Sequence, residues 1–84
     1  MPSTLFDQAV IDSKQLSQKP SNDTLLKLYS LYKQSTDGDV IGEAPSNPFD
    51  FVAKAKYEAW KLLKGKSTET EQKEYILLVN SLMN

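Results

Sequence analysis

Cysteine, histidine and arginine are all absent from this 84-residue sequence, so its ten basic residues are all lysines. Without cysteine or histidine there is no thiolate nucleophile, no disulfide, no histidine general base and no zinc site of the usual kind. Proteins that read bases or phosphates mostly use the forked guanidinium of arginine, so its absence argues against sequence-specific nucleic-acid binding. We therefore expect no enzyme, no metal site, no cofactor and no nucleic-acid partner.

Long apolar runs are missing as well. No segment approaches the roughly 18 consecutive apolar residues that a membrane-spanning helix requires. Residues 1–13 have no basic side chain and carry Asp7 and Asp12 within their apolar pattern, which is not typical of a secretory signal. We expect a cytoplasmic protein without stable membrane insertion.

The composition favours one small globular domain. Hydrophobic residues make up 39% of the chain, including four tyrosines, three phenylalanines and one tryptophan, which is enough to build a core. A single domain over residues 1–84 is predicted, near the smallest size at which one core suffices, and a monomer is expected. The net charge is only -1, so any attraction to phosphate must come from a local arrangement of charges.

Apolar residues recur with the 3.6-residue period of a helix in four stretches, and no segment favours a strand instead. The predicted fold class is therefore all-α, a bundle of four helices. From Thr36 to Pro48 the chain has two glycines, two prolines and little periodicity, which predicts a long loop between the second and third helices. The predicted helices cover residues 3–16, 22–35, 50–64 and 68–82.

Local signals mark where these helices begin and end. The proline after the first helix disfavours helical backbone at the residue before it, and Ser21 or Asn22 can then cap the second helix. Gly65 can adopt the left-handed conformation that ends the third helix. Thr68 and Glu71 have the spacing of a capping box at the start of the fourth helix.

Two tyrosines and a lysine fall on one face of the second helix. In "LYSLYKQSTDGD", residues 28–39, Tyr29, Tyr32 and Lys33 are three and four residues apart and so point the same way. One interpretation is structural: the rings lie at the core boundary and the lysine is solvated. The other is a site for a ligand with a flat aromatic part and negative charge, such as a nucleotide, because rings stack and an ammonium binds anions.

The stretch "AKAKYEAWKLLKGKS", residues 53–67, holds five lysines against one glutamate. Such runs commonly coat an exposed helix face. By helical spacing, however, Lys56, Trp60 and Leu63 share a face, which places Lys56 at the edge of the apolar side. Lys56 could there neutralise a phosphate of a ligand lying across the bundle, whereas Trp60 is better explained as a core residue than as a ligand contact.

These motifs follow one another in a specific order: "LYSLYKQSTDGD", then "FDFVAKAKYEAWKLLKGKS" at residues 49–67, then "EYILLV" at residues 74–79. Together they resemble the acyl-CoA-binding protein family, and the resemblance extends from Phe6 to Val79. It implies a four-helix bundle with an up-down-down-up arrangement that carries fatty-acyl coenzyme A thioesters in a shallow surface bowl. It also implies a carrier and not an enzyme.

The resemblance further implies a set of ligand-binding residues on all four helices. They are Lys14 on the first helix, Tyr29, Tyr32 and Lys33 on the second, Lys56 on the third and Tyr75 on the fourth. The sequence departs from the family at Val52, where many members have a lysine, and its loop between Asp39 and Phe49 is slightly longer.

The chemistry of the expected ligand agrees with these residues. Coenzyme A presents an adenine ring, a 3′-phosphate and a pyrophosphate, which call for a stacking surface and several converging cations. Tyr32 can supply the stacking face, while Lys33 and Lys56 can supply charge to the 3′-phosphate. The hydroxyls of Tyr29 and Tyr75 can donate hydrogen bonds.

The acyl chain requires a separate apolar groove. Its candidate residues, which could instead simply fill the core, are Leu5, Phe6, Ala9, Leu25 and Leu26. The sequence is thus predicted to encode an intracellular carrier and pool former for long-chain acyl-CoA, with transient contact to the enzymes that use it. The alternative is a small helical protein-protein interaction module that uses the same aromatic residues and ignores coenzyme A.

Overall fold

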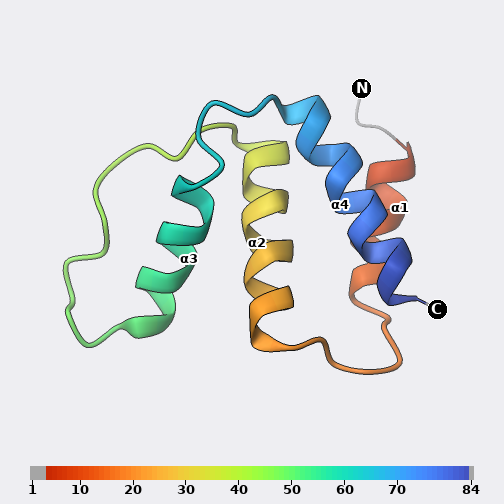
Figure 1. The fold of residues 1–84 in the computed structure, drawn as a ribbon, viewed down its shortest axis with the longest axis horizontal. Coiled ribbons are helices and arrows are strands. Elements are labelled where there is room, and N and C mark those ends of the chain that lie inside the picture. Colours follow the sequence, from red (N-terminus) through yellow and green to blue (C-terminus); the bar gives the residue numbers. More distant parts are fainter. Residues whose placement is uncertain (1–3, 84) are drawn as a thin grey trace.

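Four helices form the regular structure of residues 4–83, the part of the chain that the computed structural model describes. They are α1 (Thr4–Ser13), α2 (Asn22–Thr36), α3 (Phe51–Lys61) and α4 (Thr68–Leu82). α2 and α3 run in one direction and α1 and α4 in the other, as Figure 1 shows. The predicted all-α, up-down-down-up bundle is confirmed, and within the described residues no helix is both long and apolar enough to cross a membrane.

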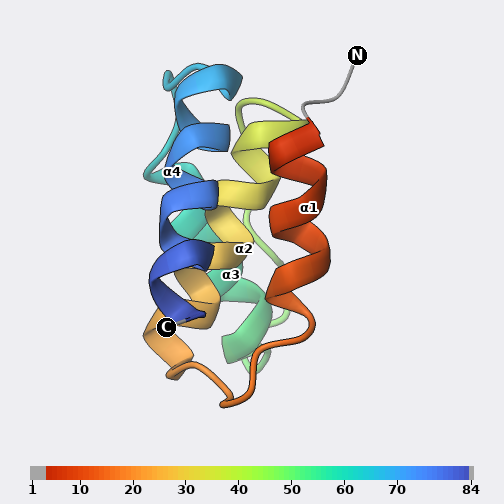
Figure 2. The ribbon, with the colours of Figure 1, turned by 90° about the vertical axis from the view of Figure 1, so that its right-hand side faces the viewer.

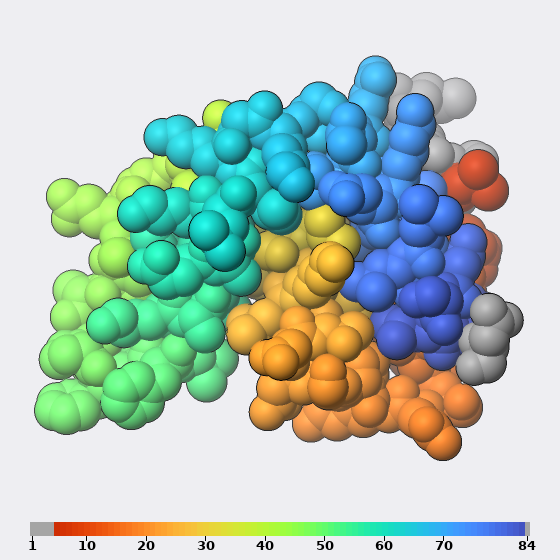
Figure 3. Space-filling model, in the orientation of Figure 1, coloured from red at the N-terminus to blue at the C-terminus, as the bar shows by residue number. Residues whose placement is uncertain are grey.

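The four helices do not contribute equally to the interior. α2 lies between α3 and α4 and contacts both, while α1 packs against α4 (Figures 1 and 2). α3 contributes no fully buried side chain. On the face shown in Figure 3, side chains of α2 remain visible between those of α3 and α4. The core lies among α1, α2 and α4 and consists of Phe6, Ala9, Leu28, Leu31, Tyr75 and Val79.

Side chains cap the first turns of α2 and α3. Ser21 Oγ accepts a hydrogen bond from Thr24 N at 3.2 Å, as expected from the sequence. Asp50, the last residue of the long loop of residues 37–50, accepts one at Oδ1 from Ala53 N at 3.0 Å. Each cap satisfies one of the backbone amides that a helix leaves unpaired at its start.

The start of α4 differs from the predicted capping box. Its N-cap is Ser67, whose Oγ accepts from Thr70 N at 3.1 Å, and not Thr68. Glu71 therefore lies one position too far along the helix to complete a capping box. Its carboxylate is instead buried, and neither oxygen has a hydrogen-bond partner. The prediction was wrong by one residue because two adjacent hydroxyl residues could both serve as the cap.

α1 ends at Ser13, before the predicted Leu16. The backbone continues with a tighter turn in which Lys14 N donates to Ile11 O at 3.1 Å. A bond to the carbonyl three residues back closes the last turn without extending the α-helix. The predicted start of this helix at Ser3 lies outside the described residues.

α3 also ends before its predicted limit, at Lys61 and not Lys64. Here too the next turn is tighter, because Lys64 N donates to Lys61 O at 3.1 Å. Gly65 adopts the left-handed conformation, with φ of 93°, as the sequence predicted. It does so beyond the helix proper, where the chain turns toward α4.

Candidate ligand-binding site

Two open hollows meet at α2, where they share Leu25 and Tyr29. The tyrosine bowl, about 400 Å³ in volume, is lined by Val10, Ser13, Lys14, Leu25, Leu28, Tyr29, Tyr32 and Tyr75. The interhelix groove lies between α2 and α3, has a similar volume of about 400 Å³, and is lined by Asn22, Leu25, Leu26, Tyr29, Phe51, Val52, Ala55 and Lys56. Five of the six predicted ligand-binding residues therefore line one hollow or the other.

Three aromatic rings support the tyrosine bowl. The ring centroid of Phe6 lies 5.3 Å from that of Tyr75 in an edge arrangement and 6.2 Å from that of Tyr32 in a stacked one. Phe6 and Tyr75 are buried, whereas Tyr32 is 39% exposed. Packing against Phe6 and Tyr75 holds the Tyr32 ring in place, and its exposed part lines the bowl.

The hydroxyl of Tyr75 joins α4 to the end of α1. It donates to Ser13 Oγ at 3.1 Å, and Ser13 Oγ donates in turn to Val10 O at 2.7 Å. Burial raises the pKa of Tyr75, so the hydroxyl remains protonated at neutral pH. This chain of hydrogen bonds fixes the part of the bowl formed by Tyr75 and the end of α1, beside the Tyr32 ring, whose centroid lies 6.2 Å from that of Tyr75.

Two lysines lie over aromatic rings across the contact between α2 and α3. Lys56 Nζ is 5.2 Å from the centroid of the Tyr29 ring, and Lys33 Nζ is 4.9 Å from that of Trp60. Tyr29 and Lys33 are four residues apart on α2, as are Lys56 and Trp60 on α3, so each helix supplies one ring and one cation. This pairing places both lysines along the contact between α2 and α3, each over a ring of the other helix, and the sequence did not predict these lysine-ring contacts.

The indole of Trp60 is held by hydrogen bonds to a buried glutamine and to the loop that follows α2. Its Nε1 donates to Gln34 Oε1 at 3.1 Å and to Gly38 O at 2.9 Å. The side chain of Gln34 is fully buried, and its Nε2 donates to Asp39 Oδ1 at 2.8 Å and to Lys66 O at 2.9 Å. One glutamine thus joins α2, the long loop, α3 and the approach to α4.

Asp39 completes this network on the loop side. Its Oδ1 also accepts from Gly65 N at 2.8 Å. The hydrogen bonds from Gly65 and Gln34 lower the pKa of Asp39, so the carboxylate stays ionised as an acceptor. The glycine-aspartate pair at the end of "LYSLYKQSTDGD" therefore has a structural role in positioning Trp60.

Lys33 lines neither hollow, and its ammonium lies over the Trp60 ring. Its ammonium forms an ion pair with Asp37, one turn further along α2. The hydrogen bond to Asp37 raises the pKa of Lys33, so the lysine remains charged. Trp60 is partly buried and supports Lys33, a role between the core residue and the ligand contact considered from the sequence.

The predicted residues of the acyl groove are divided by the structure. Leu25 and Leu26 line the interhelix groove. Phe6 and Ala9 belong to the core, and Leu5 is 70% exposed on α1. The remaining apolar wall comes from the start of α3 and consists of Phe51, Val52 and Ala55. The signal for this wall was Val52, an apolar residue at a position where the resemblance led us to expect a lysine.

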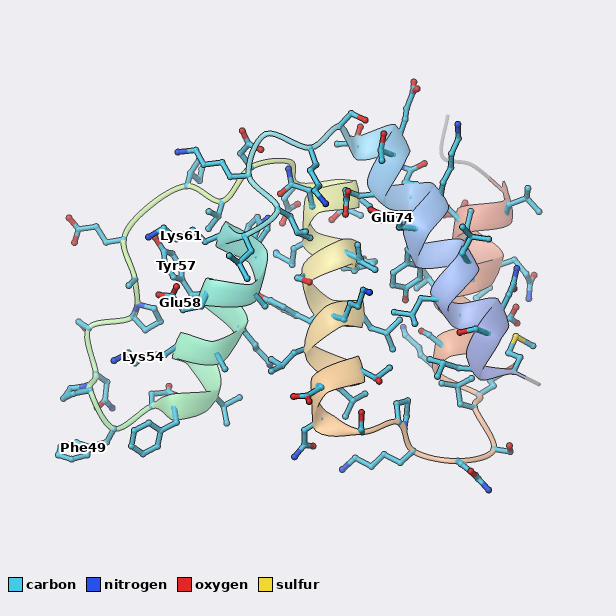
Figure 4. All side chains as sticks on the ribbon, in the orientation of Figure 1. Phe49, Lys54, Tyr57, Glu58, Lys61 and Glu74 are labelled. Carbon is cyan, nitrogen blue, oxygen red and sulfur yellow. The ribbon has the colours of Figure 1, made fainter. Side chains whose placement is uncertain are left out.

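The lysine-rich stretch of α3 has two sides. Figure 4 shows Lys54, Glu58 and Lys61 on the side of α3 that faces the long loop and not α2. Lys56 faces α2 and lies over Tyr29. Most of this basic run therefore coats an exposed face, and one lysine reaches the site.

The fold is a small all-α bundle, and its candidate site joins an open aromatic bowl with lysines to an apolar groove. This combination is typical of a binding protein for a ligand that is partly anionic and partly apolar. Comparison with family models makes this class specific. The model described as acyl CoA binding protein matches residues 3–79, and the chain belongs to this family. The resemblance drawn from the motifs is confirmed.

Relatives match along nearly the whole chain. The acyl-CoA-binding protein of Saccharomyces cerevisiae is 48% identical over 83 residues, which are 99% of this chain and 94% of that protein. That of Dictyostelium discoideum is 47% identical over 79 residues, covering 94% of this chain and 93% of its own. The crystal structure of Oryza sativa acyl-CoA-binding protein 2 matches with a TM-score of 0.86 at 37% identity, over 93% of this chain and 86% of that one.

Proposed function

We propose that this protein binds long-chain fatty-acyl-CoA thioesters reversibly and serves as an intracellular carrier and pool former. The observation that carries the proposal is the meeting of the two hollows at Leu25 and Tyr29. A nucleotide head in one hollow and an acyl chain in the other would be continuous there. Membership of the acyl-CoA-binding protein family supports the same ligand.

The head group is assigned to the tyrosine bowl and the adjoining lysines. Adenine stacks on the exposed part of the Tyr32 ring, and the 3′-phosphate lies between Lys33 and Lys56, whose ammonium groups are already held over rings. The hydroxyl of Tyr29 donates a hydrogen bond to the same head group. Lys14 adds a cation from the end of α1, and the Tyr75 hydroxyl, whose hydrogen is donated to Ser13, offers its oxygen as an acceptor.

The acyl chain is assigned to the interhelix groove. Its apolar wall is formed by Leu25, Leu26, Phe51, Val52 and Ala55. Burying roughly ten methylenes there would contribute on the order of 8 kcal/mol before the cost of ordering the chain. Phosphate contacts alone would bind free coenzyme A as well as its thioester, so the groove supplies the selectivity for the acyl form.

The role we propose is sequestration without chemistry. A carrier keeps an amphiphilic ligand away from membranes and slows hydrolysis of its thioester by enclosing it. The sequence offers no histidine or cysteine to activate a nucleophile. We propose a monomeric, cytoplasmic protein in which residues 1–84 form one acyl-CoA-binding domain, with transient contact to acyl-CoA-using enzymes.

Calorimetric titration with palmitoyl-CoA, free coenzyme A and free palmitate tests this function. We expect tight one-to-one binding of the thioester and much weaker binding of either half, because head and chain are held in adjoining hollows. Equally feeble heats from all three ligands would contradict the proposal. The aromatic face of α2 would then be a candidate surface for a partner protein.

A further inference from the structure

Of the two lysines proposed to bind the 3′-phosphate, Lys33 already has an acidic partner, Asp37. The Asp37 carboxylate forms an ion pair with the ammonium of Lys33. The side chains of Lys33 and Asp37 are 29% and 51% exposed, so the pair lies at the surface, open to a ligand. Lys56, by contrast, lies over the Tyr29 ring and forms no ion pair with a carboxylate among residues 4–83.

We infer that Asp37 is an internal competitor for the ligand phosphate and limits how tightly the head group is held. This inference rests on the proposed function, in which Lys33 binds the 3′-phosphate. A carboxylate and a phosphate both require the N–H donors of the same ammonium. The carboxylate of Asp37 takes up one of the three N–H donors of Lys33 and neutralises part of its charge, so the phosphate meets a lysine that is already partly paired and not a vacant cation.

The surroundings of Lys33 allow the phosphate to bind without moving the lysine. Trp60 lies 4.9 Å from its ammonium and is fixed by Gln34 and Gly38, so Nζ keeps its place over the ring. Asp37 is the more exposed partner and follows the last residue of α2. Rotation of its side chain into solvent frees the donors of Lys33, but leaves a negative charge close to the incoming phosphate.

Helix stability does not explain an aspartate at this position. Asp37 is the C-cap of α2, and its amide bonds to Lys33 O. A carboxylate at the carboxyl end of a helix is disfavoured by the helix dipole. The exposed ion pair with Lys33, four residues earlier, offsets only part of that cost. Replacing the carboxylate by an amide is therefore expected to leave the fold intact while removing the competitor.

The consequence for a carrier lies in release. Because Asp37 stays close to the phosphate site, Lys33 can pair with it again as the ligand leaves. Affinity differences between variants of one binding site lie mainly in the dissociation rate, so we expect Asp37 to speed release. The acyl chain, bound in the separate interhelix groove, is unaffected. Asp37 thus shifts the balance of binding from the head toward the chain.

The test compares D37N with D23N, a matched loss of one carboxylate on the same helix about 21 Å away along its axis. In calorimetric titration with palmitoyl-CoA, D37N is expected to bind about two- to fivefold more tightly than wild type, whereas D23N changes affinity less. D37E, which keeps the charge, is expected to bind like wild type. With the 3′-dephospho form of palmitoyl-CoA, the gain of D37N should shrink toward the value for D23N.

A second arm tests whether Asp37 acts through Lys33. In a K33Q background the gain from D37N should be much smaller than in the wild-type background, because the donor for which the two anions compete is absent and only the repulsion between Asp37 and the phosphate remains. If the wild type binds palmitoyl-CoA but D37N and D23N bind it with equal affinity, the inference is wrong and the proposed function remains in place. A gain that is undiminished with K33Q or with the 3′-dephospho ligand also overturns it. Absence of binding by the wild type itself defeats the proposed function.

Discussion

The two flanks of α2 are held by different forces. On one flank, α1, α2 and α4 enclose the buried apolar core. On the other, α3 buries no side chain fully and is attached through the two lysine-ring contacts and the hydrogen bonds of Gln34. Apolar burial is the dominant stabilising force in folding, whereas each polar contact exchanges with water and contributes less.

This difference is informative because the site lies along the junction of the two flanks. The wall of the tyrosine bowl is built on core residues and is therefore expected to be rigid. One wall of the interhelix groove belongs to α3, which is expected to open at lower free energy than the core. With the head group in the bowl and the acyl chain in the groove, as we propose, a rigid head-group site beside a more adaptable groove suits a ligand whose head is constant and whose chain varies in length.

The largest effect should come from the core flank. Leu31 on α2 is only 2% exposed, so L31A is expected to lower the free energy of unfolding by about 2–5 kcal/mol. Leu62, just after α3, is 82% exposed, and L62A should cost less than about 0.5 kcal/mol. Chemical denaturation followed by circular dichroism measures both. Similar losses for the two variants would remove the contrast between the flanks.

The core flank also contains a pH-dependent weakness at Glu71. Burial, with the neighbouring charge of Glu74, raises the pKa of Glu71 to about 7, although Lys66 opposes the shift. In the unfolded chain this carboxyl ionises near its ordinary value of 4.5. Between these two values the unfolded state has released a proton that the folded state retains, so stability falls as pH rises through this window.

The test of Glu71 compares E71Q with E69Q, an exposed glutamate in the same first turn of α4. Relative to E71Q, the wild type should lose up to about 3 kcal/mol of unfolding free energy between pH 4 and pH 8. The pH profile of E69Q should follow that of the wild type. Parallel profiles for wild type and E71Q would show that the carboxyl titrates normally.

A smaller, local effect is expected where α3 is attached. W60F removes the indole donor and leaves the acceptors on Gln34 and Gly38 without it, at a cost of about 1–3 kcal/mol. Hydrogen exchange should then accelerate in α3 more than in α4. Y57F is the control on the same helix, because the Tyr57 hydroxyl makes only a 3.4 Å contact with Gly42 O. Uniform acceleration across all helices would contradict local attachment.

The sequence predicted the features that depend on neighbouring residues. Helical periodicity located all four helices, and the serine after Pro20 identified the start of α2. The ends of α1 and α3 were placed too late, because a tight final turn and a further α-helical turn have the same apolar pattern. The cap of α4 was misplaced between Ser67 and Thr68 for a similar reason: both residues carry the required hydroxyl.

The candidate site was less predictable, since its arrangement depends on contacts between helices. The motifs indicated Tyr29, Tyr32 and Tyr75, and the structure brings these residues together in one bowl. The burial of Gln34 and the pairing of Lys33 with Asp37 were not anticipated from the same quoted stretch. Polar residues on a helix are ordinarily solvated, so only the packing of α3 and the loop shows which of them are held.

The smallest predicted effect tests the groove side of the comparison. Val52 lines the apolar wall and is 64% exposed, so V52K should weaken palmitoyl-CoA binding only about two- to fourfold, because a lysine stem covers apolar surface while its charge stays in water. Octanoyl-CoA, whose shorter chain makes less use of this wall, should be affected less, and L62K controls for the added charge at the other end of α3. Calorimetry with both thioesters measures the difference. Equal changes for the two chain lengths would place the acyl chain elsewhere, and would leave the adaptable flank without a role in selecting it.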